Sequence, residues 1–216
     1  MSRAENAVPP RLRRQWRLAV GCVGVATIVA AATVGSAFEP RTGGLWLAGA
    51  TPVVAYGLWF LGRSLGRNRS GGDGGDGDAI SPTLGPANLV TLGRGWLYAA
   101  VAGFLLVVPS VGSPWRWIPF LLYGSGAALD AVDGLLARTV GDETELGAKL
   151  DMAFDTVGFL VAPLVGVVWG RLPVWYLSIS VARYLFKLGR GWRRHRGKPV
   201  SDLPESRVRR PLAGVQ

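Results

Sequence analysis

The stretch Asp130–Asp155 reads DAVDGLLARTVGDETELGAKLDMAFD and lies between two strongly apolar segments. Charged groups are expensive close to lipid, so a regular set of carboxylates at such a place indicates a function. In the first half, Asp130 and Asp133 are three residues apart and share one face of a helix. In the second half, Asp151 and Asp155 are four residues apart and form a stripe on another helix. If the two faces meet, four carboxylates converge.

Converging carboxylates require cations. Four of them cannot all stay ionised without compensating positive charge, and the nearby Lys149 and Arg138 are too few to supply it. Sites made only of oxygen ligands suit hard ions such as Mg²⁺ or Mn²⁺. Four carboxylates can hold two such ions roughly 3.5–4 Å apart. The spacing therefore predicts a two-metal site with phosphoryl-type chemistry, rather than four unrelated, solvated aspartates at helix ends.

The segments around this stretch are typical of an integral membrane protein. The chain has 216 residues, 49% of them hydrophobic and nine of them Trp. Its apolar residues fall in long blocks, and about 20 such residues cross a bilayer as a helix. The pattern predicts an all-α, polytopic helix bundle with about six spans. We expect these spans at residues 18–38, 45–62, 87–108, 117–137, 146–170 and 173–189.

The basic residues predict the orientation of these spans. The formal net charge is +10, and most Lys and Arg residues lie in segments that share one side of the predicted membrane topology. Cytoplasmic loops are enriched in Lys and Arg, so we expect the N-terminus and the carboxylates to face the cytoplasm in a multi-pass cell-membrane protein. The same charge could attract nucleic acid, but no nucleic-acid-binding module is recognisable and we expect no such partner. The segments on the cytoplasmic side would be 1–17, 63–85, 139–149 and 187–216.

The stretch resembles the signature of the CDP-alcohol phosphatidyltransferase family, D-x2-D-G-x2-A-R-x8-G-x3-D-x3-D. All eight fixed positions are filled, by Asp130, Asp133, Gly134, Ala137, Arg138, Gly147, Asp151 and Asp155. Upstream, Asn88, Thr91 and Arg94 are similar to the N-x2-T-x2-R element of the family's first core helix. The resemblance covers about residues 84 to 190. It implies an enzyme of phospholipid biosynthesis that transfers a phosphatidyl-type group from a CDP-linked lipid to an alcohol, with release of CMP.

The resemblance also implies a role for each signature residue. Asp130, Asp133 and Asp151 would hold two Mg²⁺ or Mn²⁺ ions. Asp155 would contact a metal ion and take the proton from the attacking hydroxyl. The remaining signature residues and the upstream element would serve the nucleotide. Of these, the small residues Gly134, Ala137 and Gly147 would let the cytidine diphosphate lie close to the helices. Three polar residues would contact the nucleotide or brace the site, namely Arg138, Asn88 and Thr91.

A binding site for the acceptor alcohol is less sharply indicated. Arg183, Lys187 and Arg190 recur at intervals of three or four residues near the inner end of the last span. They could bind a phosphate on the acceptor, as in glycerol phosphate or inositol phosphate. The alternative is that they anchor the helix at the interface, with their side chains reaching into water. Gly166 and Gly170 form a small-xxx-small pair that could pack helices in a homodimer or within one chain.

The chain divides into four predicted parts. Two extra spans occupy residues 1–62, a flexible Gly/Asp-rich linker occupies 63–85, the family core occupies 86–190, and a basic tail occupies 191–216. The family core usually has six helices, whereas four spans follow the linker here. Either the first two helices take the place of the missing last pair, or the chain is a fragment. Two alternative functions stay open: a hydrolase of CDP-linked lipids that uses the same ions, and an inactive membrane interaction protein that kept the fold.

Overall fold

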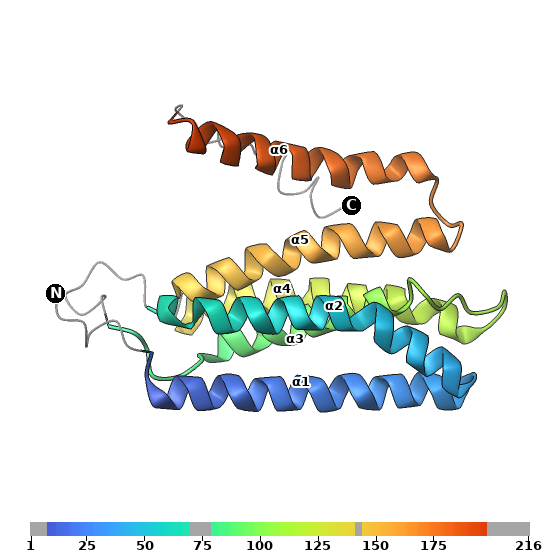
Figure 1. Cartoon of the computed structure of the whole chain (residues 1–216), viewed down its shortest axis with the longest axis horizontal. Helices are drawn as coiled ribbons and strands as arrows, with labels where there is room; N and C mark the ends of the chain where they lie inside the picture. The colour runs from blue at the N-terminus through green and yellow to red at the C-terminus, as the bar shows by residue number, and fades with distance from the viewer. Residues whose placement is uncertain (1–7, 70–78, 141–143, 198–216) are drawn as a thin grey trace. The chain divides into compact units, whose positions relative to one another are not determined.

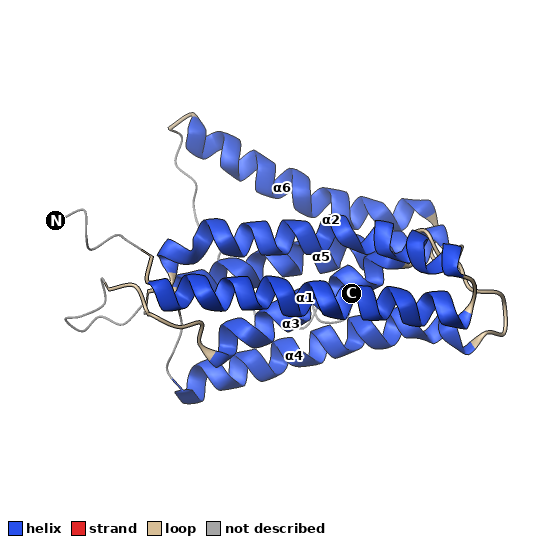
Figure 2. Ribbon diagram, turned by 60° about the horizontal axis from the view of Figure 1, so that its bottom comes forward, coloured by secondary structure: helices blue, strands red, loops and turns tan. Residues whose placement is uncertain are grey.

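The computed structural model describes residues 8–69, 79–140 and 144–197, without the side chains of residues 131–140, Arg183 and Lys187. Its regular elements are helices (Figure 2). Six of them are long: α1 Pro10–Ala37, α2 Pro40–Ser64, α3 Pro86–Gly103, α4 Ile118–Val140, α5 Glu145–Val168 and α6 Leu177–His195. Short 3₁₀ turns lie at η1 Leu65–Arg67, η2 Pro114–Trp117 and η3 Val174–Tyr176.

The six predicted spans are therefore confirmed as helices, although their ends differ. Among the described residues, three helical segments are long and apolar enough to cross a membrane, namely Pro10–Ala37, Pro40–Arg67 and Glu145–Val168. The first helix begins eight residues before its apolar block, because Leu12 is fully buried and the Trp16 ring donates a hydrogen bond to the Leu58 carbonyl (3.2 Å). Tertiary contacts thus extend the helix into basic sequence.

Prolines mark the starts of the first three helices. Pro10, Pro40 and Pro86 each occupy a first-turn position, where a missing N–H has no consequence and the fixed φ favours a helix. Pro52 lies inside α2, and this helix changes direction along its length in Figure 1. Membrane helices tolerate such a residue where neighbours satisfy the freed carbonyl.

Helix α3 is the centre of the N-terminal compact unit, which extends to Tyr176. It packs against α2, α4 and α5, whereas α4 and α5 touch each other only slightly (Figures 1 and 2). Helix α1 packs mainly on α2, so the two extra helices form a hairpin attached to the core through α2. At the contact between α2 and α3, the buried Trp46 of α2 lies where a side chain on Gly103 of α3 would be. A Cβ added to Gly103 would lie only 2.4 Å from the ring nitrogen.

The two ends of the predicted linker are structured. Asn68, just after η1, is fully buried, and its side-chain amide donates hydrogen bonds to the carbonyls of Ser81 (3.2 Å) and Thr83 (2.8 Å). The backbone N–H of Leu84 donates to Gln15 of α1 (2.6 Å). These bonds tie the chain between α2 and α3 to the end of the bundle from which α3 starts. The middle of the linker lies outside the described residues.

The small-residue pair Gly166 and Gly170 lies at the turn after α5 and makes contacts within the chain. A Cβ on Gly166 would lie 2.7 Å from the Leu172 side chain, and Gly170 lies beyond the helix with a φ of +67°, which favours glycine. Both glycines therefore shape this turn. Helix α6 belongs to a separate C-terminal unit. Within it, cationic groups lie over aromatic rings, with Arg190 above Phe186 (5.9 Å) and Arg196 above Trp192 (4.1 Å).

Candidate functional site

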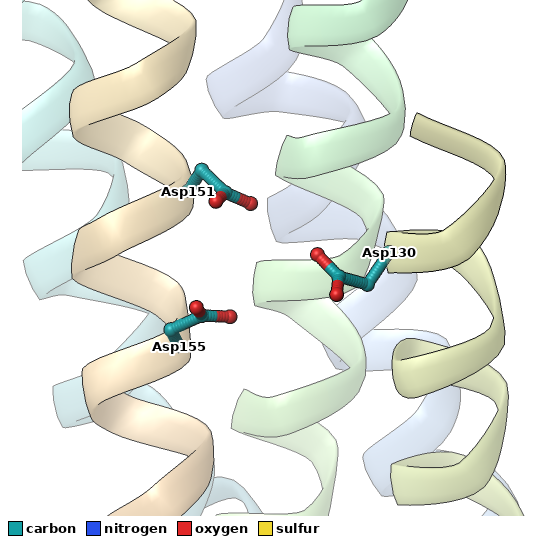
Figure 3. A group of neighbouring side chains, drawn as sticks. All are labelled: Asp130, Asp151 and Asp155. Carbon is teal, nitrogen blue, oxygen red and sulfur yellow. The ribbon is translucent and has the colours of Figure 1, made fainter. Parts of the chain in front are cut away.

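Three of the four signature carboxylates come together. Asp130 of α4 faces Asp151 and Asp155 of α5, and each residue offers an oxygen within 4.8 Å of the others (Figure 3). Asp151 and Asp155 are one turn apart on the same face of α5, as the spacing predicts. The convergence of the two helix faces is therefore confirmed for these three residues. The other signature side chains on α4, those of Asp133, Gly134, Ala137 and Arg138, lie outside the described residues.

The carboxylates lie one to three turns inside their helices, close to the depth that the predicted spans imply. Helix α4 continues for ten residues beyond Asp130, three more than the predicted span. On α5, Asp151 and Asp155 follow the first helical residue by six and ten positions, which is about 9 and 15 Å at 1.5 Å per residue. Their side chains nevertheless remain 43% and 34% exposed, and that of Asp130 is 53% exposed. The cluster is thus within the bundle yet open to a ligand.

The cation at the centre of this cluster is Arg94 of α3. Its guanidinium donates hydrogen bonds to Asp130 and Asp151 and lies 3.2 Å from Asp155. The side chain is fully buried, and its Nε has no hydrogen-bond partner among the described residues. In the sequence, Arg94 is similar to the last residue of the upstream N-x2-T-x2-R element, but this similarity predicted no role for it. Its spacing of three from Thr91 and six from Asn88 was a usable signal, because all three residues then lie on one side of a helix.

Glycines let aromatic side chains enter between the helices beside the cluster. Phe154 packs where Gly95 has no side chain, and an added Cβ there would lie 2.4 Å from the ring. Tyr98 packs in the same way against Gly126 of α4 and Gly158 of α5, with an added Cβ at 2.6 and 2.9 Å. Both aromatic residues are buried. Their packing holds α4 and α5 against α3 on either side of Arg94.

Asn88 braces the start of α5. Its amide donates to the Asn68 side chain (3.2 Å) and to the Thr144 hydroxyl (3.3 Å). Thr144 is the N-cap of α5 and accepts a hydrogen bond from the Gly147 backbone N–H (3.0 Å). A Cβ on Gly147 would lie 2.6 Å from the Asn88 oxygen. Asn88 was expected either to contact the nucleotide or to brace the site, and its observed contacts are those of a brace. Because Gly147 has no side chain, Asn88 can approach α5 closely.

The other residues singled out in the sequence either make contacts elsewhere or have no described side chain. Thr91 is buried, and its hydroxyl donates to the Ala87 carbonyl (3.0 Å) within α3. Lys149, considered as a counter-charge, is paired with Glu145 on the exposed surface of α5. Arg183 and Lys187 belong to the C-terminal unit, and their side chains lie outside the described residues.

The donor set fits a hard divalent cation. Three carboxylates face one guanidinium, so two negative charges of the described cluster are not balanced by Arg94. Arg94 bonds to the Oδ1 oxygen of each aspartate. A carboxylate has two oxygens with about four acceptor sites, so these aspartates have acceptor sites beyond the ones that Arg94 occupies. Oxygen ligands of this kind are those preferred by Mg²⁺ and Mn²⁺.

Comparisons with known proteins agree with this geometry. A family model described as CDP-alcohol phosphatidyltransferase matches residues 85–209, which is more than half of the chain. A cardiolipin synthase (CMP-forming) from Streptomyces coelicolor is 35% identical over 83 residues, covering 37% of this chain and 38% of that protein. The matched part therefore spans little more than a third of the length of this relative. No solved structure matches the chain.

Proposed function

The chain belongs to the CDP-alcohol phosphatidyltransferase family, and from this premise we propose that it transfers a phosphatidyl-type group from a CDP-linked lipid to an alcohol, releasing CMP. The observation that carries the proposal is the meeting of Asp130, Asp151 and Asp155 around one accessible point. The name of the Streptomyces relative describes a reaction that forms CMP, and this supports the same leaving group here. We favour a CDP-diacylglycerol-type donor.

The proposed step exchanges one P–O bond for another. The hydroxyl oxygen of the acceptor attacks the phosphorus that carries the lipid, and the bond from this phosphorus to the bridging oxygen breaks. CMP leaves with the bridging oxygen and its electron pair. The hydroxyl proton passes to Asp155, the carboxylate that we assign as general base.

The aspartates have a second role in this proposal. Asp130, Asp151 and Asp155, with Asp133, would hold two Mg²⁺ or Mn²⁺ ions. When bound, such ions neutralise the pyrophosphate and stabilise the charge that develops on the departing CMP. Asn88 and Thr144 keep the start of α5 in register with α3, which sets the position of Asp151 and Asp155. Gly134, Ala137 and Arg138 are proposed to contact the nucleotide.

A direct assay tests this function. The purified full chain in detergent would be given CDP-diacylglycerol, Mg²⁺ or Mn²⁺, and a panel of acceptors that includes glycerol phosphate, inositol phosphate and a phospholipid with free headgroup hydroxyls. We expect metal-dependent CMP release with one acceptor. Asp155→Asn should lower the rate by on the order of 10²-fold or more, because it removes the base and a metal ligand.

A matched variant controls for nonspecific effects of removing a charge. Glu145→Gln also neutralises an acidic residue of α5, but Glu145 pairs with Arg67 and Lys149 outside the cluster and should retain activity. CMP release without any acceptor would instead identify a hydrolase. If no CDP-linked donor, including CDP-choline-type compounds, yields CMP, the transferase proposal is wrong and an inactive interaction protein is favoured.

A further inference from the structure

We propose that Arg94 is a positioning residue: a fixed internal cation that keeps the three carboxylates assembled while their exposed side stays open to metal ions. The inference deepens the proposed function, because it concerns the same carboxylates, but it also makes a claim about the metal-free protein. It rests on the place of Arg94 in the bundle, on its contacts and on the charge of the cluster.

The first observation is that one guanidinium joins three helices. Arg94 projects from α3, the helix against which α4 and α5 both pack. Its two terminal nitrogens reach Asp130 on α4 and both aspartates on α5. Because α4 and α5 touch each other only slightly, this contact joins carboxylates from helices that have little other direct contact. A planar fork of donors can bridge carboxylates in this way, whereas a lysine ammonium cannot reproduce its geometry.

The second observation is the burial of the arginine relative to its partners. Arg94 is fully buried, while the aspartate side chains are 34–53% exposed. Burying a charge is unfavourable unless it is paired, so Arg94 depends on the aspartates as much as they depend on it. The guanidinium therefore binds the cluster from inside the bundle, and a ligand reaches the same carboxylates from their exposed side.

The charges explain what this arrangement does. Without Arg94, three carboxylates with oxygens within 4.8 Å of one another would repel one another, and the helices that carry them would be pushed apart. With Arg94 present, the repulsion is reduced but not removed. The cluster stays assembled without metal ions and still attracts them. Arg94 is thus expected to remain in place when metal ions bind, rather than to be displaced by them.

The test measures thermal stability of the full chain with and without metal. Melting temperatures of the wild type and Arg94→Gln would be compared in chelator and in saturating Mg²⁺. In chelator, Arg94→Gln should melt roughly 6–20 °C lower, as expected for breaking a buried charge cluster in a chain of this size. Addition of Mg²⁺ should raise the melting temperature of the variant by more than that of the wild type, because the ions then supply the missing positive charge.

A matched control uses another arginine of the same unit. The Nε of Arg116 is also buried without a hydrogen-bond partner, but no ion pair of Arg116 occurs among the described residues. Arg116→Gln should leave the Mg²⁺-induced shift at its wild-type value. An equal Mg²⁺ shift in Arg94→Gln and the wild type would show that Arg94 only fills space in the core, and would overturn the proposal.

A double variant keeps the test decisive if Arg94→Gln does not fold. Adding Asp130→Asn removes one of the unbalanced carboxylates, so the double variant should fold and melt higher in chelator than Arg94→Gln alone. If the second substitution brings no recovery, the carboxylates do not depend on Arg94 as proposed. These measurements need no substrate. A protein that shows this coupling but releases no CMP would support the inference on Arg94 and contradict the proposed function.

Discussion

At the scale of single residues, the site depends on glycines, which leave room for neighbouring rings, as much as on its charged side chains. Gly95 follows Arg94 on α3, and the Phe154 ring occupies the space beside it. Phe154 in turn precedes Asp155, so the fit of one ring against one glycine sets the distance between the cation and the carboxylate. The sequence indicated the carboxylates through their spacing, but Gly95 lies outside the signature and carried no comparable signal.

Gly95→Ala tests this fit. The added Cβ would lie 2.4–2.6 Å from the buried Phe154 ring, so the ring or the helices must shift. We expect a loss of about 1–3 kcal/mol in the free energy of unfolding, together with reduced transfer activity. The matched control is Gly93→Ala on the same helix, where a Cβ meets nothing within 4 Å. This variant should gain about 0.5–1 kcal/mol, because alanine favours a helix interior over glycine. Equal stability of the two variants would contradict the role of Gly95.

At the scale of elements, the start of α5 determines where its carboxylates lie. The predicted span began at residue 146, close to the observed start at Glu145. The hydrophobic pattern did not predict how this end of α5 is held in place. Thr144 caps the helix and is hydrogen-bonded to Asn88 of α3. Two helices far apart in sequence are thereby held in register. Side-chain hydrogen bonds of this kind have no periodic signature, so only the folded chain identifies the partner of Asn88.

Thr144→Ala should loosen this end of the helix. It removes the acceptor for the Gly147 N–H and a partner of Asn88. The expected loss is about 1 kcal/mol, the usual value for an N-cap. A melting curve in detergent would record it as a shift of roughly 2–4 °C. Thr144→Ser keeps the hydroxyl and should melt near the wild type. If the serine variant is as unstable as the alanine variant, the hydroxyl is not what secures the helix.

At the scale of the whole molecule, the distribution of charge complements the placement of the site. Most basic residues lie in segments that share one side of the predicted topology, and the aspartate cluster lies in the half of α5 nearer to that side. A CDP-linked substrate is polar and cytosolic at one end and lipid at the other. An open carboxylate cluster about 9–15 Å along α5 from the end that we predict to be cytoplasmic would suit a substrate of this shape.

Accessible cysteines would test the orientation. With the exposed Cys22 replaced by serine, Ala79→Cys and Val111→Cys place single thiols before and after α3 respectively, at exposed positions. The positive-inside rule predicts that an impermeant maleimide labels Val111→Cys in intact cells. It should label Ala79→Cys only after the membrane is opened. The reverse pattern would place the N-terminus and the active site outside. Labelling of both thiols in opened membranes confirms that each is reactive.

The sequence by itself determined the helices, their approximate ends, the carboxylate stripes and the type of chemistry they indicate. These follow from the period of a helix and the thickness of a bilayer, which act on neighbouring residues and leave a readable spacing. Only the tertiary structure decided that Arg94 meets Asp130, Asp151 and Asp155, residues 36, 57 and 61 positions away. It also decided that Asn88 meets Thr144. Such contacts depend on which faces of α3, α4 and α5 pack together, and this is set by the fit of residues such as Phe154 and Tyr98 against glycines on other helices.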